Sequence, residues 1–219
     1  GAVLASPDST NELRFDISFK LNKSAEAYVA FWPKHNPEKR YFSQLSVQNT
    51  DHKLKLVGLK GGMDYQFQVI ARGKENSRIS ETGEFTTAEF PINILHLRWE
   101  QEERTGLSGY ILSQRRLVNG VIYMIDEDGD VVWYQPIPRQ PKLSHWTSNH
   151  AILVLYGTAS HRNSAGDHIV EYDLNGKERF HLDLSALDKP MEAHHEVRYD
   201  GNDQLVTLVY EFRNFDLSK

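Results

Sequence analysis

The chain has 219 residues, no cysteine and a formal net charge of −5, with 39% hydrophobic and 11% aromatic residues. This length allows one or two domains. The lack of cysteine excludes disulfides, thiolate metal sites and CxxC redox motifs. The charge is mixed and slightly acidic, which argues against a dedicated nucleic-acid surface. There is no run of about 18 apolar residues, so we expect no transmembrane span.

The first part of the chain predicts short strands that follow a polar tail at residues 1–11. Residues 13–21 alternate between apolar and polar side chains, which is typical of a strand with one buried face. Further strands are predicted at residues 27–32, 41–47, 52–57, 65–71 and 84–87. Short strands at this spacing indicate an all-β fold, most simply an antiparallel sandwich over residues 12–89.

A motif within this part sharpens the prediction. Leu59-Lys60-Gly61-Gly62-Met63-Asp64-Tyr65, followed by Phe67 and Val69, resembles the fibronectin type III pattern of a leucine, a turn and a tyrosine that enters the next strand. The resemblance implies that Tyr65 is a tyrosine corner, whose hydroxyl group bonds to the backbone of the preceding turn. Tyr65 is therefore expected to determine the fold rather than to form a site.

A different pattern fills residues 90–219. Two similar hairpins are predicted, at residues 121–133 and 169–180, and their turn residues Asp126 and Asp173 are 47 residues apart. Asp, Asn and Gly in the turns tolerate a positive φ. Strand-like segments at 146–156 and 197–210 complete a period of four strands, which is typical of a β-propeller blade.

About two and a half such blades fit into residues 90–219. Propellers close with about four to eight blades, so the sequence predicts an incomplete propeller. We expect a partner chain or a missing C-terminal segment to complete it. The alternative is an ordinary β-sandwich in which the 47-residue echo is accidental.

Histidines are concentrated in the second part of the chain. Seven of the ten lie between residues 145 and 195: His145, His150, His161, His168, His181, His194 and His195. Imidazole can attack as a nucleophile or hold an anion or a metal. The adjacent pair His194-His195, followed by Glu196, is the most distinctive element. The alternative is that these histidines are simply solvated in loops.

The hairpin from Asp126 to Trp133 (Asp-x-x-Gly-x-x-x-Trp), the His194-His195-Glu196 element and a small sandwich ahead of a propeller together resemble the arylsulfate sulfotransferase family, best over residues 90–219. The resemblance implies an enzyme that moves a sulfuryl group from a phenolic sulfate donor to a phenolic acceptor through a sulfated histidine. It implies no cofactor, and it implies a periplasmic or extracellular location.

The resemblance also implies site residues. His194 and His195 are the catalytic candidates. Adjacent side chains on a strand face opposite ways, so at most one of them would face the channel, and His195 is favoured. The family's sulfated histidine lies further along the propeller, so the pair would supply a hydrogen-bond donor or a general acid. Arg213, Tyr156 and His161 are candidates for substrate contacts, or else are surface and packing residues.

Two other classes of function stay open. One is a non-catalytic extracellular binding module for carbohydrate or protein, with an aromatic surface supplied by Trp99, Trp133 or Trp146, unless these residues are blade core. The other is zinc held by imidazoles with Glu196 or Asp200. The sequence has no HExxH motif or compact ligand set, so no metal is predicted. Nucleotide-binding and serine-hydrolase motifs are also absent.

Overall fold

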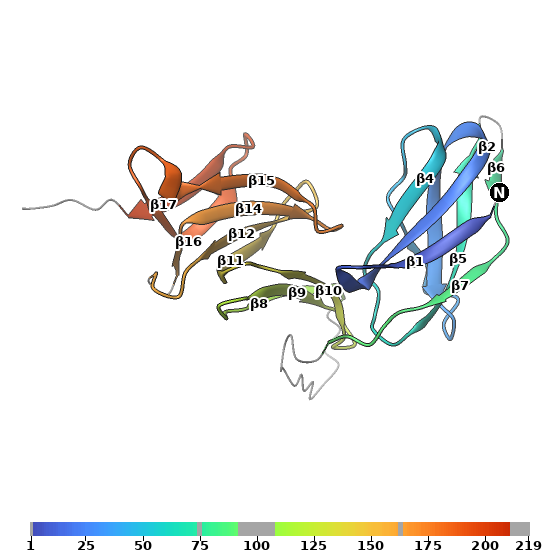
Figure 1. The fold of residues 1–219 in the computed structure, drawn as a ribbon, viewed down its shortest axis with the longest axis horizontal. Helices are drawn as coiled ribbons and strands as arrows, with labels where there is room; N and C mark the ends of the chain where they lie inside the picture. The colour runs from blue at the N-terminus through green and yellow to red at the C-terminus, as the bar shows by residue number, and fades with distance from the viewer. Residues whose placement is uncertain (1, 74–75, 92–107, 162–163, 211–219) are drawn as a thin grey trace, which may run out of the picture. The chain divides into compact units, whose positions relative to one another are not determined.

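The computed structural model describes residues 2–73, 76–91, 108–161 and 164–210 (Figure 1). The regular secondary structure of the described chain is β-strand apart from a short 3₁₀ turn at Leu184–Ala186, so the predicted all-β class is confirmed. None of its helical turns has the length and hydropathy to span a membrane. Contacts divide the chain into a first unit, Gly1–Leu107 with Asp126–Trp133, and a second unit, Ser108–Ile125 with Tyr134–Lys219.

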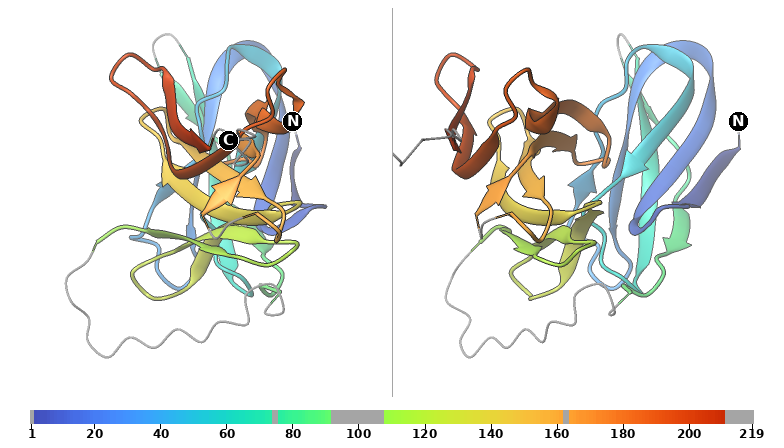
Figure 2. Two further views of the ribbon diagram at one scale, coloured as in Figure 1. Left: turned by 90° about the vertical axis from the view of Figure 1, so that its left-hand side faces the viewer. Right: turned by 60° about the vertical axis from the view of Figure 1, so that its left-hand side comes forward.

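The first unit contains one curled antiparallel sheet of seven strands (Figures 1 and 2). They are β1 (Val3–Asp8), β2 (Asn11–Pro33), β3 (Tyr41–Phe42), β4 (Asn49–Leu56), β5 (Asp64–Arg72), β6 (Ser77–Ile79) and β7 (Gly83–Thr86). The long β2 organises the sheet, because its first half pairs with β1 and β4 and its second half pairs with β3 and β5. The register shifts between Lys20 and Ala25, where the sheet curls.

The curl closes the sheet around an apolar core. Alternate residues of both halves of β2 point inward, beginning with Phe15 and Ile17 and continuing with Val29 and Phe31. Tyr65 is 1% exposed, and its hydroxyl oxygen accepts a hydrogen bond from the backbone N–H of Lys60 at 2.9 Å. This is the contact predicted for Tyr65.

Three local predictions for this unit were wrong. The expected polar tail contains β1, which pairs with the first half of β2, and the strands expected at 13–21 and 27–32 are one continuous strand. The strand expected at 41–47 is reduced to Tyr41–Phe42. There the Oγ atoms of Ser43 and Ser46 accept hydrogen bonds from backbone N–H groups of β2 in place of carbonyl oxygens, which ends the regular ladder.

The second unit is built from three small antiparallel sheets. The first sheet contains β8 (Ile111–Arg115), β9 (Val121–Ile125) and β10 (Val131–Pro136). The second contains β11 (Gln140–Trp146), β12 (Ala151–Gly157), β14 (His168–Asp173) and β15 (Glu178–Asp183), in that order. The third contains β13 (Ala165–Gly166), β16 (Glu192–Tyr199) and β17 (Leu205–Tyr210). Every residue of β12 and β14 is buried, so both faces of these central strands are covered.

One turn geometry recurs four times, at residues 126–130, 147–151, 173–177 and 200–204. In each turn the backbone N–H of the first residue donates to the carbonyl oxygen of the fifth. The N–H of the fifth residue donates to the side-chain oxygen of the first. The fourth residue has a positive φ in every case: Gly129 at 85°, His150 at 59°, Gly176 at 82° and Asp203 at 57°. The 47-residue spacing of Asp126 and Asp173 in the sequence therefore corresponds to two copies of this turn.

Candidate functional site

Titratable side chains gather at one end of the sheet formed by β11, β12, β14 and β15. The ladder places Tyr156, near the end of β12, opposite His168 at the start of β14. Between Pro141 and Leu143 the register of β11 shifts, so that Lys142 occupies a bulge beside Tyr156. Bulges of this kind re-aim side chains and are common next to active sites. We refer to His161, Asp167, His168 and His181 as the histidine cluster.

A chain of contacts fixes the protons within this cluster. The Nδ1 atom of His181 lies 3.4 Å from Oε1 of Glu178, so the carboxylate favours a proton on Nδ1 of His181. The Nε2 atom of neutral His181 is then an acceptor, and it lies 3.0 Å from Nδ1 of His168. His168 therefore donates through Nδ1, which leaves a lone pair on its Nε2 atom.

His168 is buried and held in the neutral form. Burial lowers its pKa below the usual value, although the charges of Asp167 and Asp183 oppose this shift. Its ring stacks on Tyr156 with a centroid distance of 4.9 Å. Its Nε2 atom has no hydrogen-bond partner in the described part of the chain, and it lies 3.7 Å from Oδ1 of Asp167. A neutral imidazole with an unengaged lone pair has the chemistry of a nucleophile or a base.

The ring of His161 is also held in a defined orientation. Its ring lies against Gly157, where an added Cβ would come within 2.4 Å of Nδ1. The backbone N–H of Thr158 donates to this Nδ1 atom at 3.0 Å, which places the proton of neutral His161 on Nε2. That nitrogen lies 3.9 Å from Asp167 and 3.7 Å from Glu192. His161 is therefore arranged to donate a hydrogen bond through Nε2, while His168 is arranged to accept an electrophile.

Two cations accompany the histidines. Arg139 lies 3.2 Å from the carboxylate of Asp167 and offsets its charge. Lys142 is 2% exposed, and its ammonium group donates to Oε1 of Gln140 at 2.5 Å. Burial and the neighbouring Arg116 lower the pKa of Lys142. A buried lysine whose ammonium group donates to an amide oxygen is costly to maintain, and such groups are concentrated at functional sites.

The structure brings together two of the five predicted site residues. Tyr156 and His161 both lie at the histidine cluster. His194 and His195 lie on β16, and Arg213 lies outside the described residues. His168 and His181 were counted among the seven clustered histidines, but no local pattern distinguished them. Lys142 carries no sequence signal at all, because its burial depends on the bulge in β11.

The histidine pair departs from regular strand geometry. His194 pairs with Ala165 and Leu208, and its ring stacks on Tyr210 at 4.0 Å. His195 is exposed with a φ of 60°, and the register shifts between His194 and Val197. The expectation that the two side chains alternate as on a regular strand is therefore wrong, because His195 lies in a bulge.

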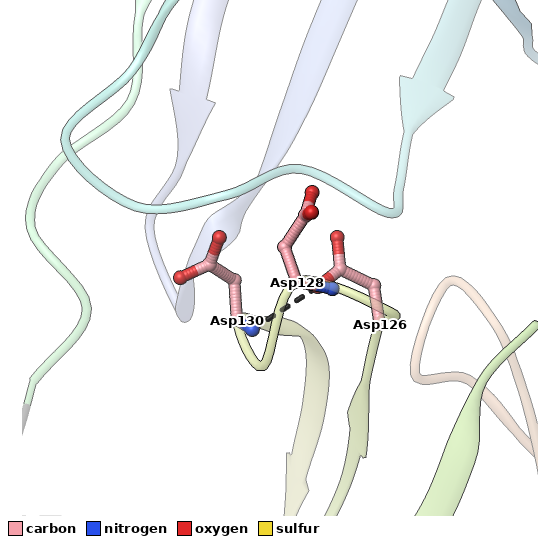
Figure 3. Close-up of side chains that lie close together, drawn as sticks. All are labelled: Asp126, Asp128 and Asp130. Carbon is pink, nitrogen blue, oxygen red and sulfur yellow. Dashed lines mark hydrogen bonds between the residues drawn. The ribbon is translucent and has the colours of Figure 1, made fainter. Parts of the chain in front are cut away.

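One compact group of acidic side chains occurs in the first unit. Among the described residues, Asp126, Asp128 and Asp130 are the set of potential metal ligands whose oxygens all lie within 4.8 Å of one another (Figure 3). The Nζ atom of Lys60 lies 2.8 Å from Asp126, 2.8 Å from Asp128 and 2.7 Å from Asp130. An ammonium group thus neutralises this cluster, which we assign as a structural ion-pair network.

Comparison with protein-family models finds no match to this chain, and no curated protein matches it significantly. No comparison therefore links the chain to the arylsulfate sulfotransferases. The argument for function rests on the geometry of the site.

Proposed function

We propose that the protein is a sulfuryl transferase that uses phenolic sulfate donors and phenolic acceptors, with His168 as the residue that carries the sulfuryl group. The observation that supports this most is the contact chain from Glu178 through His181 to His168. It leaves the lone pair of a neutral, buried imidazole on Nε2. A second group that orients the reacting residue is the usual arrangement of covalent catalysis.

The reaction balances in two steps. In the first, Nε2 of His168 attacks sulfur, an N–S bond forms, and the S–O bond to the aryl group breaks. The phenolate leaves as an anion, and His161 stabilises it by a hydrogen bond from its Nε2–H without losing the proton. In the second step the acceptor enters as its phenolate and attacks sulfur, and the N–S bond breaks. Splitting one transfer into two covalent steps lowers the barrier of each.

Two cations lie among the carboxylates that surround His168. Arg139 and Lys142 supply positive charge, which stabilises sulfuryl oxygens best where water is excluded. The ring of Tyr156 covers one face of His168, which helps to exclude water. Because Nε2 of His168 is buried, a substrate reaches it only if a neighbour moves aside. The side chain of Arg139, 43% exposed, is the neighbour most free to do so.

The same proposal extends to the architecture. The curled sheet of the first unit, with the Tyr65 contact, supports a fibronectin type III-like sandwich. The recurring turn supports propeller blades in the second unit. Phenolic donor and acceptor are the expected partners, and a location in the periplasm or outside the cell accompanies the proposed chemistry.

The experiment is a transfer assay with 4-nitrophenyl sulfate as donor and phenol as acceptor. The wild-type chain should release 4-nitrophenol and form phenyl sulfate. His168→Gln keeps a polar side chain of similar length but removes the nucleophilic nitrogen, so transfer should fall at least about 1,000-fold. His35→Gln, which alters an exposed histidine of the first unit, is the matched control and should leave transfer unchanged.

His195→Ala distinguishes the earlier candidate from His168. If the pair on β16 carries the sulfuryl group, transfer disappears in His195→Ala and persists in His168→Gln. That result, obtained with variants whose circular dichroism matches the wild type, would overturn the role of His168. Failure of the folded wild type to transfer any sulfuryl group would overturn the proposed function.

A further inference from the structure

A pocket of about 620 Å³ lies in the second unit, away from the histidine cluster. The strand β11 begins at Gln140 beside Gly157 and ends at Trp146 beside Ile152. The histidine cluster lies at the first of these ends and the pocket at the second. Its walls come from the end of β11, the turn that follows it, the end of β16 and the turn at 200–204.

An exposed indole ring dominates this pocket. Trp146 is 47% exposed, whereas Trp133 is 2% exposed and forms core. The ring of Trp146 meets His150 edge to face at 6.3 Å, which helps to fix its orientation. A large aromatic ring held open beside a hollow provides a flat apolar surface with a polar edge, which favours ligand binding.

Fixed polar groups surround the ring. Arg198 and Glu196 form an ion pair at 3.5 Å on the pocket wall. Oδ1 of Asp200 accepts backbone N–H bonds from Asn202 at 2.8 Å and Gln204 at 2.9 Å, so this carboxylate is held in place by its own turn. These groups offer both donors and acceptors, of which Asp200 is held by the backbone.

One polar atom at the wall lacks a partner. His145 lies directly before Trp146, and its Nε2 atom is buried without a hydrogen bond in the described part of the chain. A buried polar atom of this kind costs free energy unless some group bonds to it.

We propose that this pocket binds an uncharged saccharide. The wall carries one cation, Arg198, against three carboxylates, Glu196, Asp200 and Asp203, so an anion such as an aryl sulfate is disfavoured. A cationic ligand would gain little binding energy from these carboxylates, because Arg198 already neutralises Glu196 and two backbone N–H groups bond to Asp200. A sugar ring matches both features, with its C–H face on Trp146 and its hydroxyl groups on the ion pair and carboxylates. The inference does not depend on sulfuryl transfer.

Calorimetric titration of the whole chain tests the proposal. The probes are neutral oligosaccharides of gluco, manno, galacto and xylo configuration, with choline as a cation and phenyl sulfate as an anion. We expect at least one saccharide to bind. Its affinity should fall about tenfold or more in Trp146→Ala, which loses the stacking surface, and also in Arg198→Ala.

The matched control is Phe180→Ala, which removes an exposed aromatic ring of β15 that does not line the pocket. Saccharide affinity should be unchanged in this variant and in His168→Gln. The proposal is overturned if no saccharide binds to the folded chain, or if binding is equally strong in Trp146→Ala. It is also overturned if choline or phenyl sulfate, rather than a sugar, binds in a manner that depends on Trp146.

Discussion

Two shielded lysines, one in each unit, show how the same residue type can have opposite surroundings. Lys60 contacts three carboxylates of the turn at 126–130, and although burial opposes it, these contacts raise its pKa. Lys142 is more deeply buried and donates to the amide oxygen of Gln140, and burial lowers its pKa. The first arrangement stabilises a charge within the fold. The second holds a charge at a cost, which is expected where the charge serves a ligand.

A dense group of acidic side chains is not by itself a functional site in this molecule. The aspartates at 126–130 have the more compact set of oxygens (Figure 3). Lys60 nevertheless forms ion pairs with all three. The histidine cluster is less symmetrical, but it retains an unengaged nitrogen on His168. A polar atom without a hydrogen bond, rather than a high density of charged groups, therefore identifies the candidate site.

The largest effect should come from Lys142→Met. Methionine has a similar length and no charge, so the sulfuryl oxygens lose a cation and transfer should fall about 100- to 1,000-fold. Stability should stay equal or rise by about 1 kcal/mol, because an apolar side chain replaces a buried charge. Phenol release and urea unfolding measure the two quantities. Unchanged transfer with a large loss of stability would assign Lys142 a purely structural role.

Lys60→Met should have the opposite pattern of effects, with a loss of stability and no loss of transfer. Three carboxylates lose their counter-charge, and we expect a loss of about 2 kcal/mol. This is below the value for a fully buried pair, because Asp128 and Asp130 are 39% and 56% exposed. Transfer should be unaffected. The same urea unfolding and phenol-release measurements apply, and a variant as stable as wild type would show that the ion-pair network does not hold the turn.

Gly157→Ala tests the packing of His161. The new methyl group would come within 2.4 Å of Nδ1 of His161 and 2.8 Å of the Cα atom of Gly166, so the ring must move. We expect a loss of about 1 to 2 kcal/mol together with weaker transfer. Gly201→Ala, where nothing lies within 4 Å, is the control and should change stability by less than about 0.5 kcal/mol. Equal effects of the two substitutions would contradict the close packing of His161.

The smallest effect concerns pH. Because the pKa of Lys142 in the folded protein lies below 10.5, the unfolded chain binds more protons between the two values. The contribution of Lys142 to stability therefore rises with pH in that window and levels off above 10.5. The contribution of Lys60 is fully present below 10.5 and is lost only as pH rises through its raised pKa. Urea unfolding across this range should show the stability of the wild type rising relative to that of Lys142→Met. A constant difference in stability would contradict the lowered pKa of Lys142.

Much of the fold was predictable because local chemistry specifies it. The Asp-Gly turns at 126–130 and 173–177 were found from composition, and Tyr65 was assigned its hydrogen bond from a short motif. The same turn at 147–151 was not found, because Thr147 and His150 replace the aspartate and glycine. The continuous β2 was missed as well, since the tertiary pairing of its two halves overrides the polar stretch between them.

The site was predictable only in part. Histidine density identified the segment that contains the histidine cluster, and Tyr156 and His161 were named individually. The contact between His168 and His181 depends on the pairing of β14 with β15, including a register shift between Glu171 and Tyr172. The burial of Lys142 depends on the bulge in β11. The spacing of apolar residues along the chain does not encode the register between paired strands. The sequence therefore could not predict these contacts.

The most direct test of the central claim is the mass of the protein after exposure to 4-nitrophenyl sulfate without acceptor, at mildly alkaline pH, where a sulfated imidazole survives best. Our account predicts one added SO₃ group, release of 4-nitrophenol, and fragmentation that places the group on His168. The His168→Gln variant should show no added mass. An unmodified wild type, or a sulfuryl group on another residue, would contradict it.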